Sequence, residues 1–180
     1  MSEFETAPET HDEPTYDAPE DHGHAILAEF PDGSQTLTLD GDSDGYADVV
    51  ANDADGDGNP ETVYTDEYGS ERLDTLYVDA NDNGIFEASV SDRNEDGHAD
   101  LLQLDRNEDG SVDTIVADQD FDGAADTLIA DRDFDGNVDL IAENPDEDAH
   151  IDRLTLDTDG DGHLDTVHYG DKDTNPFVNA

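Results

Sequence analysis

The sequence predicts an all-β protein made of ten tandem 13-residue repeats, arranged as a β-roll, which is a solenoid with two strands per coil. An elongated antiparallel β meander is the alternative. Three observations carry this prediction: acidic residues recur with a fixed period of 13, short β-branched and aliphatic stretches separate them, and the net charge is −46. Because Leu, Ile, Val and Phe are scarce in so charged a chain, it must either stay unfolded or recruit cations.

The composition excludes several classes of protein. Only 6 basic residues stand against 52 acidic ones, which excludes nucleic acid and anionic membrane surfaces as partners, because both need clustered Lys and Arg. No apolar run approaches the roughly 18 residues of a membrane span, so no membrane insertion is expected. The chain has no cysteine, which excludes disulfides, thiolate metal sites and a cysteine nucleophile.

The repeat begins at Asp40 and continues without insertion through Tyr169. Its pattern, with positions counted from one to thirteen, starts Asp-x-Asp/Asn-x-Asp/Asn-Gly-x-x-Asp/Glu. All ten units carry an acid at position nine, and eight carry glycine at position six. Since 33 of the 52 acids stand at positions one, three, five and nine, they are held in register and are not scattered over a surface. The units begin at Asp40, Asp53, Asp66, Asp79, Asp92, Asp105, Asp118, Asp131, Asn144 and Asp157.

This spacing is typical of a loop that wraps around a hard cation. Carboxylates at positions one, three and five of a tight loop can converge on one centre, where they would repel each other strongly without a cation. Glycine at position six permits a sharp turn, position seven offers its backbone carbonyl, and the acid at position nine closes the loop. All-oxygen ligation favours Ca²⁺ over Mg²⁺. No unit has a carboxylate at position twelve, so these loops are not EF-hands.

Eight units keep the ligand pattern, which predicts about eight Ca²⁺ ions that staple the repeats. The candidate ligands stand at positions one, three, five, seven and nine. In the first four of these units they are Asp40, Asp42, Asp44, Tyr46, Asp48, Asp53, Asp55, Asp57, Asn59, Glu61, Asp79, Asn81, Asn83, Ile85, Glu87, Asp92, Asn94, Asp96, His98 and Asp100. In the other four they are Asp105, Asn107, Asp109, Ser111, Asp113, Asp118, Asp120, Asp122, Ala124, Asp126, Asp131, Asp133, Asp135, Asn137, Asp139, Asp157, Asp159, Asp161, His163 and Asp165.

These loops resemble those of known calcium-binding repeats. Asp40 to Asp48, Asp118 to Asp126 and Asp157 to Asp165 are similar to the calcium loops of integrin-type FG-GAP and VCBS repeats and of thrombospondin type 3 repeats. FG-GAP units are several times longer, and thrombospondin repeats carry cysteines that this chain lacks. The tandem units also look like uncharacterised aspartate-rich repeat proteins of actinobacteria. The resemblance implies calcium binding and no established activity.

Two units depart from the pattern. The unit of Asp66 lacks acids at positions three and five and has Glu71 in place of glycine, so we expect it to bind no metal. The unit of Asn144 has Ala149 at position six. A left-handed alanine costs on the order of 1 kcal/mol, which predicts a weak site there.

The stretches between the loops predict short strands. Segments such as 114–117, 127–130 and 140–142 are β-branched and aliphatic, and they are too short for helices. Position eleven is aliphatic in nine of ten units, and position eight is apolar in nearly all, which indicates a structural core. Apolar residues alternate between positions twelve and thirteen, which indicates a period of 26 residues. The roll is favoured because stacked coils bury a continuous stripe, whereas an open meander leaves it uncovered.

Composition divides the rest of the chain into three parts. Residues 1–24 are rich in Glu, Asp, Pro and Thr and predict a disordered acidic tail. Residues 25–39 read as strand, turn and strand, a β-hairpin that caps the repeat region of residues 40–169. Residues 170–180 look like a decayed eleventh unit and are expected to cap the other end.

The pattern predicts a calcium-binding structural protein and no enzyme, since no nucleophile elbow, P-loop or zinc-protease motif is present. The expected role is a stalk, spacer or interaction surface that folds on binding Ca²⁺. An intracellular calcium buffer or sensor and a calcium-dependent adhesive or lectin-like module are the alternatives, and no protein or glycan partner is identified. Calcium loops favour an extracellular or cell-surface location, but no signal peptide is visible, so a cytoplasmic location stays open.

Overall fold

The computed structural model describes residues 23–145 and 150–170, which form strands, turns and loops. The all-β prediction is confirmed for this part of the chain. Within the same residues, no helix is long and apolar enough to cross a membrane. The predicted acidic tail and C-terminal cap lie almost entirely in residues 1–22 and 171–180, outside the described residues.

The strands of the repeats occupy positions ten to thirteen of each unit, where Thr, Val, Leu and Ile are frequent and favour extended backbone. Most of them are four residues long. The strands are β1 His24–Glu29, β2 Gln35–Asp40, β3 Val49–Asp53, β4 Thr62–Thr65, β5 Thr75–Val78, β6 Ala88–Ser91, β7 Leu101–Leu104, β8 Thr114–Ala117, β9 Thr127–Ala130, β10 Leu140–Glu143, β11 Arg153–Leu156 and β12 Thr166–Tyr169.

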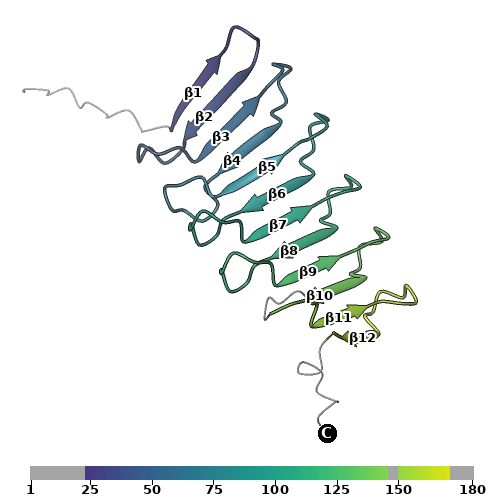
Figure 1. Ribbon diagram of the computed structural model, residues 1–180. Coiled ribbons are helices and arrows are strands. Elements are labelled where there is room, and N and C mark those ends of the chain that lie inside the picture. The colour runs from purple at the N-terminus through teal and green to yellow at the C-terminus, as the bar shows by residue number, and fades with distance from the viewer. Residues whose placement is uncertain (1–22, 146–149, 171–180) are drawn as a thin grey trace, which may run out of the picture.

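All of these strands form one open sheet in sequence order, and every neighbouring pair is antiparallel (Figure 1). This is the meander, and the favoured roll is not confirmed. The loops themselves account for the difference. The N–H of position nine donates to the carbonyl just before position one, for example from Asp100 to Ser91 at 2.8 Å. A loop closed in this way returns the chain directly beside the strand it has left.

Because successive strands run in opposite directions, alternate loops lie at opposite ends of the strands and form two rows (Figure 1). Within a row, the N–H of position one donates to the carbonyl of position nine in the preceding loop, for example from Asp118 to Asp100 at 2.9 Å. Loops two units apart are therefore neighbours in space, which explains the longer period. The first row contains the loops of Asp40, Asp66, Asp92, Asp118 and Asn144, and the second those of Asp53, Asp79, Asp105, Asp131 and Asp157.

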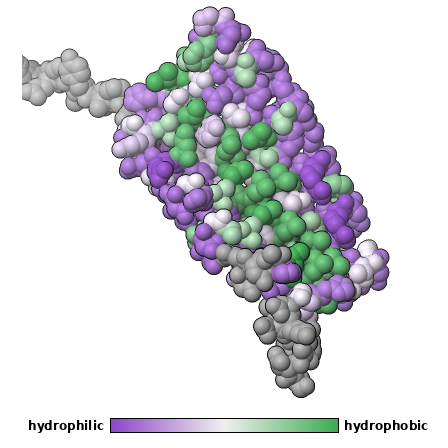
Figure 2. All heavy atoms as spheres, viewed as in Figure 1, coloured by the Kyte–Doolittle hydropathy of each residue, from purple (hydrophilic) through white to green (hydrophobic). Residues whose placement is uncertain are grey.

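The apolar stripe at position eleven divides between the two faces of the sheet. The register pairs Leu76 with Val90 on one face and Ile115 with Ile129 on the other. Each face therefore combines position eleven of one strand with position twelve of the next. Figure 2 shows the resulting band of apolar residues along the sheet, with hydrophilic residues on both sides of it.

The most buried side chains are carboxylates and not hydrophobic groups. Among the described residues, the only buried hydrophobic ones are Ala130 and Ala142, whereas twelve aspartates are buried. Position eight does not form the predicted core, since Leu73 and Phe86 are 36% and 38% exposed on a sheet of one layer. The buried aspartates all stand at position one or nine: Asp53, Asp74, Asp79, Asp100, Asp105, Asp113, Asp118, Asp126, Asp131, Asp139, Asp152 and Asp157.

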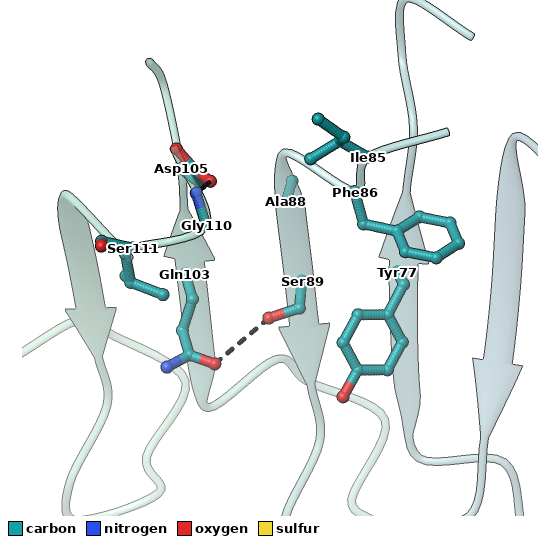
Figure 3. Close-up of a pocket in the computed structure, with 10 residues that line it drawn as sticks. Tyr77, Ile85, Phe86, Ala88, Ser89, Gln103, Asp105, Gly110 and Ser111 are labelled. Carbon is teal, nitrogen blue, oxygen red and sulfur yellow. Dashed lines mark hydrogen bonds between the residues drawn. The ribbon is translucent and has the colours of Figure 1, made fainter. Parts of the chain in front are cut away.

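A polar pair interrupts the apolar pattern in the middle of one face. Ser89 stands at position eleven, where other units have an aliphatic residue, and its hydroxyl donates to the side-chain oxygen of Gln103 at 3.2 Å. The pair lies in a groove beside the rings of Tyr77 and Phe86, whose centroids are 5.9 Å apart (Figure 3). Ser89 is therefore satisfied by a polar neighbour on the next strand.

The hairpin of β1 and β2 precedes the repeats and packs its turn against the second row of loops. The N–H of Phe30 donates to the carbonyl of Ser34 at 2.9 Å and closes the turn. A Cβ at Gly56, in the loop of Asp53, would lie 2.2 Å from the carbonyl oxygen of Gly33. Only glycine allows the turn and the loop to approach this closely.

Candidate metal centres

In most of the described loops, the aspartate at position one accepts backbone N–H groups with both carboxylate oxygens. In Asp40, Oδ2 accepts from the N–H of Gly45 at 3.2 Å, and the buried Oδ1 has no hydrogen-bond partner among the described residues. In Asp53, one oxygen accepts from the N–H of Gly56 at 2.6 Å and the other from that of Gly58 at 2.9 Å. These donors stand at positions four and six. The same two contacts recur in the loops of Asp105, Asp118, Asp131 and Asp157.

Positions three and five each use one oxygen to support the turn. The side-chain oxygen of Asp42 accepts from the N–H of Asp44 at 3.1 Å, and that of Asp44 accepts from the N–H of Tyr46 at 2.8 Å. Contacts of this kind hold the chain in a tight curve and leave a second carboxylate oxygen for another purpose. Side chains at position seven are mostly exposed, Tyr46 by 54% and Ile85 by 41%, which agrees with a role for the backbone alone there.

In most of the described loops, position nine closes the loop with one carboxylate oxygen that accepts the N–H of position two. Pro145 has no N–H to donate in the loop of Asn144, and Asp165 accepts from the hydroxyl of Thr158 at 2.8 Å. The distances from the N–H of position two are 2.7 Å to Asp113, 2.6 Å to Asp126 and 2.6 Å to Asp139. In these three loops, the carboxylates at positions one and nine are both buried.

In Asp100, the carboxylate oxygen that does not close the loop has no hydrogen-bond partner among the described residues. The residue is only 2% exposed, and its Oδ2 accepts from the N–H groups of Arg93 at 2.6 Å and Asn94 at 3.1 Å. The oxygen without a partner is Oδ1, which is shielded from solvent. A buried anionic oxygen without a donor is unfavourable, and a cation at this atom would offset that cost.

Asp74, at position nine of the unit expected to bind no metal, is different. Its Oδ1 accepts from the N–H of Glu67 and the hydroxyl of Thr75, and its Oδ2 accepts from the N–H of Tyr68 at 3.0 Å. Both oxygens are satisfied by the protein. In the same loop, Glu71 adopts φ 68° at position six, where eight of the other units have glycine.

At least four of the described loops bring acidic groups close together. In each, three carboxylates have oxygens within 4.8 Å of one another. The groups are Asp40, Asp42 and Asp48; Asp53, Asp55 and Asp57; Asp118, Asp120 and Asp122; and Asp131, Asp133 and Asp139.

In the loops of Asp92 and Asp105, the asparagine at position three donates a hydrogen bond to the aspartate at position five. The amide of Asn94 donates to Asp96 at 3.1 Å, and that of Asn107 donates to Asp109 at 2.9 Å. Positions three and five thus contact one another through a hydrogen bond, and each asparagine still offers a carbonyl oxygen.

Like-charge crowding differs between the loops. Burial, followed by repulsion from Asp122, raises the pKa of Asp120. Burial, followed by repulsion from Asp135, raises that of Asp133. By contrast, the hydrogen bond from the Asn107 amide lowers the pKa of Asp109. A cation in the crowded loops would remove the repulsion.

Position four was not among the predicted site residues, yet its side chains lie against the preceding loop of the same row. Asp82 has an oxygen within 4.8 Å of those of Asp55 and Glu61, and Glu108 accepts from the amide of Asn81 at 2.7 Å. Burial, followed by repulsion from Asp57, raises the pKa of Asp82. The backbone at position four is left-handed in every loop whose position four is described. The side chain at position four therefore leaves the backbone in a different direction from the side chains at positions three and five.

The loop of Asn144 is described only in part. Residues 146–149, which include Ala149 and two of the expected ligands, lie outside the described residues, so the predicted weakness of this site stays a prediction.

Comparison with known proteins assigns no family and no function to these loops. No family model, curated protein or solved structure matches the chain. The likeness to other calcium loops therefore rests on the loop motif alone.

Proposed function

We propose that the chain is a calcium-binding structural repeat protein whose two rows of loops hold Ca²⁺ and whose sheet folds when the loops are filled. The observation that carries the proposal is the Oδ1 atom of Asp100, a buried carboxylate oxygen without a protein partner. Asp74 supports it by contrast, because both of its oxygens have partners in the unit that lacks the ligand pattern.

The loops of Asp40, Asp53, Asp118 and Asp131 are the best-supported sites, because their carboxylate oxygens already converge. The residues at positions one, three, five and nine would hold the ion, and the ion would supply the positive charge that these groups lack. The loops of Asp79, Asp92 and Asp105 offer the same oxygen donors with fewer charges, so we expect weaker binding there.

Burial explains why metal binding and folding should be coupled. The described residues bury twelve aspartates but only two hydrophobic residues, so the sheet lacks the apolar core that normally offsets the entropy lost on folding. Buried carboxylates without a counter-charge would oppose the fold further. Each site filled at a hundred times its Kd would add about 2.7 kcal/mol.

A stalk, spacer or interaction surface is the role that suits this architecture. Each unit adds one strand and one loop, so length grows with repeat number while the loops stay in two rows. The carboxylates already accept hydrogen bonds from the loop backbone, and we propose no catalytic activity for them.

Circular dichroism across a Ca²⁺ titration, starting from chelator, tests the proposal. A cooperative gain of β signal is expected. A midpoint near 10⁻⁴–10⁻³ M would agree with an extracellular structural module, whereas one at about 10⁻⁷–10⁻⁵ M would indicate an intracellular sensor. A spectrum that is fully folded in chelator and unchanged by Ca²⁺ would overturn the proposal.

A further inference from the structure

Two arginines at position two lie against the next loop of their row. The guanidinium of Arg93 stands 5.3 Å from the ring centroid of Phe121, and that of Arg106 stands 5.2 Å from the ring of Phe134. Both phenylalanines occupy position four of the loop that follows in the row. These distances are within the range of a cation–π contact.

Each guanidinium also binds backbone of the following loop. Arg93 donates to the carbonyl of Asp118 at 3.2 Å, and Arg106 donates to that of Asp131 at 3.2 Å. Both carbonyls belong to position one, where the next loop begins. One side chain therefore holds the start of the following loop and the ring at its position four.

We infer that Arg93 and Arg106 are built-in cations that join neighbouring loops in the middle of the array, so that this part keeps its order at Ca²⁺ concentrations too low to hold the ends. A guanidinium stays charged at every relevant pH and needs no metal. The part of the inference that concerns Ca²⁺ rests on the proposed function, whereas the contacts themselves do not.

Some other contacts between neighbouring loops of a row are repulsive or lack a ring. Asp82 faces Asp55 and Glu61, a contact that is repulsive without a cation. Near the C-terminus, Arg132 stands at position two like the other arginines, but position four of the following loop is Gly160, which has no ring. Contacts that require no metal also join the loops of Asp66 and Asp79 to this middle part, since Arg72 donates to the carbonyl of Glu95 at 3.3 Å and the amide of Asn81 donates to Glu108 at 2.7 Å. The cation–π contacts lie between Arg93 and Phe134.

Hydrogen exchange of the full chain, followed by mass spectrometry at a series of free Ca²⁺ concentrations, tests the inference. Peptides from residues 92–134 should keep protection at lower Ca²⁺ than peptides from residues 40–61 and 157–169. Simultaneous loss of protection everywhere, or loss in the middle first, would overturn it.

Arg93→Ala and Arg132→Ala are compared, because both remove one positive charge from position two. Arg132 also lies 3.9 Å from the carboxylate of Asp139 in its own loop, a half-exposed ion pair that contributes little. With Arg93→Ala, exchange at the Asp118 amide, which bonds to the Asp100 carbonyl, should be roughly two- to thirty-fold faster. With Arg132→Ala, the exchange rate at the corresponding Asp157 amide should change by less than about two-fold. That factor corresponds to the weakest exposed cation–π contacts. Equal effects at the two sites would show that charge alone matters and would refute the role of the ring.

A ring can also be added where one is missing. Gly160 has φ 72°, close to the 64° of Phe121 and Phe134, and a Cβ there meets no atom within 4 Å. Gly160→Phe should therefore slow exchange at Asp157 relative to Gly160→Ala, and only when Arg132 is present. This comparison needs no Ca²⁺ response: a protein indifferent to Ca²⁺ would refute the proposed function, and a null result here would refute the arginine contacts.

Discussion

At position nine, one carboxylate oxygen of Asp100 closes the loop and the other has no partner among the described residues, whereas both oxygens of Asp74 are hydrogen-bonded. Asp100→Asn should lower the number of bound Ca²⁺ ions by one, because it removes the charge of a buried oxygen while keeping the size of the side chain. Isothermal titration calorimetry gives the stoichiometry. Asp74→Asn is the matched control and should leave it unchanged; a loss in the control equal to that in Asp100→Asn would contradict the assignment.

Crowding at position three predicts opposite effects of one substitution in the presence and absence of metal. Since the pKa of folded Asp120 is raised, its anion destabilises the metal-free fold at pH 7, and this penalty is relieved as pH falls through that pKa. Asp120→Asn should therefore raise the melting temperature in chelator at pH 7 when a stabilising osmolyte such as trimethylamine N-oxide is added to populate the metal-free fold. The difference should vanish near pH 4, and the variant should bind Ca²⁺ more weakly.

Asp109→Asn is the control with the opposite sign. The pKa of Asp109 is lowered by the Asn107 amide, so its stabilising effect is present at neutral pH and is lost as pH falls. This variant should melt at a lower temperature than the wild type at pH 7 in the same mixture of chelator and osmolyte. The account of crowding fails if both variants shift the melting temperature in the same direction.

The sequence predicts some loop positions well and others not at all. The fixed spacing identified the acids at positions one and nine, which the structure places inside the loop, and the left-handed glycine at position six. It did not identify position four, because residues as different as Ser43, Asp82 and Phe121 share one left-handed conformation. The missing information was which loop lies next to which, and that depends on strand direction.

Among the elements, the strands were predicted more readily than their arrangement. The predicted segments 114–117 and 127–130 coincide with β8 and β9. The choice between roll and meander could not be made from residue types, since both place a strand and a loop in every unit. The alternation at positions twelve and thirteen was informative, and it reflects antiparallel strands that present alternate positions to the same face.

The contact between the hairpin turn and the first loop of the second row gives a sharp test at the element scale. Gly56→Ala should destabilise the protein by about 1–3 kcal/mol more than Gly69→Ala, because its Cβ would meet the Gly33 carbonyl at 2.2 Å. Gly69 is a matched control at position four: its φ of 71° is similar to the 79° of Gly56, but no atom lies within 4 Å. Urea unfolding in saturating Ca²⁺ measures both, and equal costs would argue against the packing of turn on loop.

For the whole molecule, charge and shape are linked. A single-layer sheet with a net charge of −46 and few buried apolar residues has little to hold it together without counter-charge. Eight Ca²⁺ ions would offset sixteen of these charges at the loops, where the carboxylates are buried. The effect of bound Ca²⁺ should therefore differ from that of screening by salt, which acts mainly on exposed charges.

Small-angle X-ray scattering separates these two effects. In chelator the radius of gyration should approach the roughly 45 Å of an unfolded chain of 180 residues. With Ca²⁺ it should fall to the value of a compact rod whose twelve strands span about 53 Å. Sodium chloride at 0.5 M, where the screening length is about 4 Å, should reduce the expansion only slightly. If salt alone produced the same compaction as Ca²⁺, diffuse screening would account for the fold and the loops would not be specific sites.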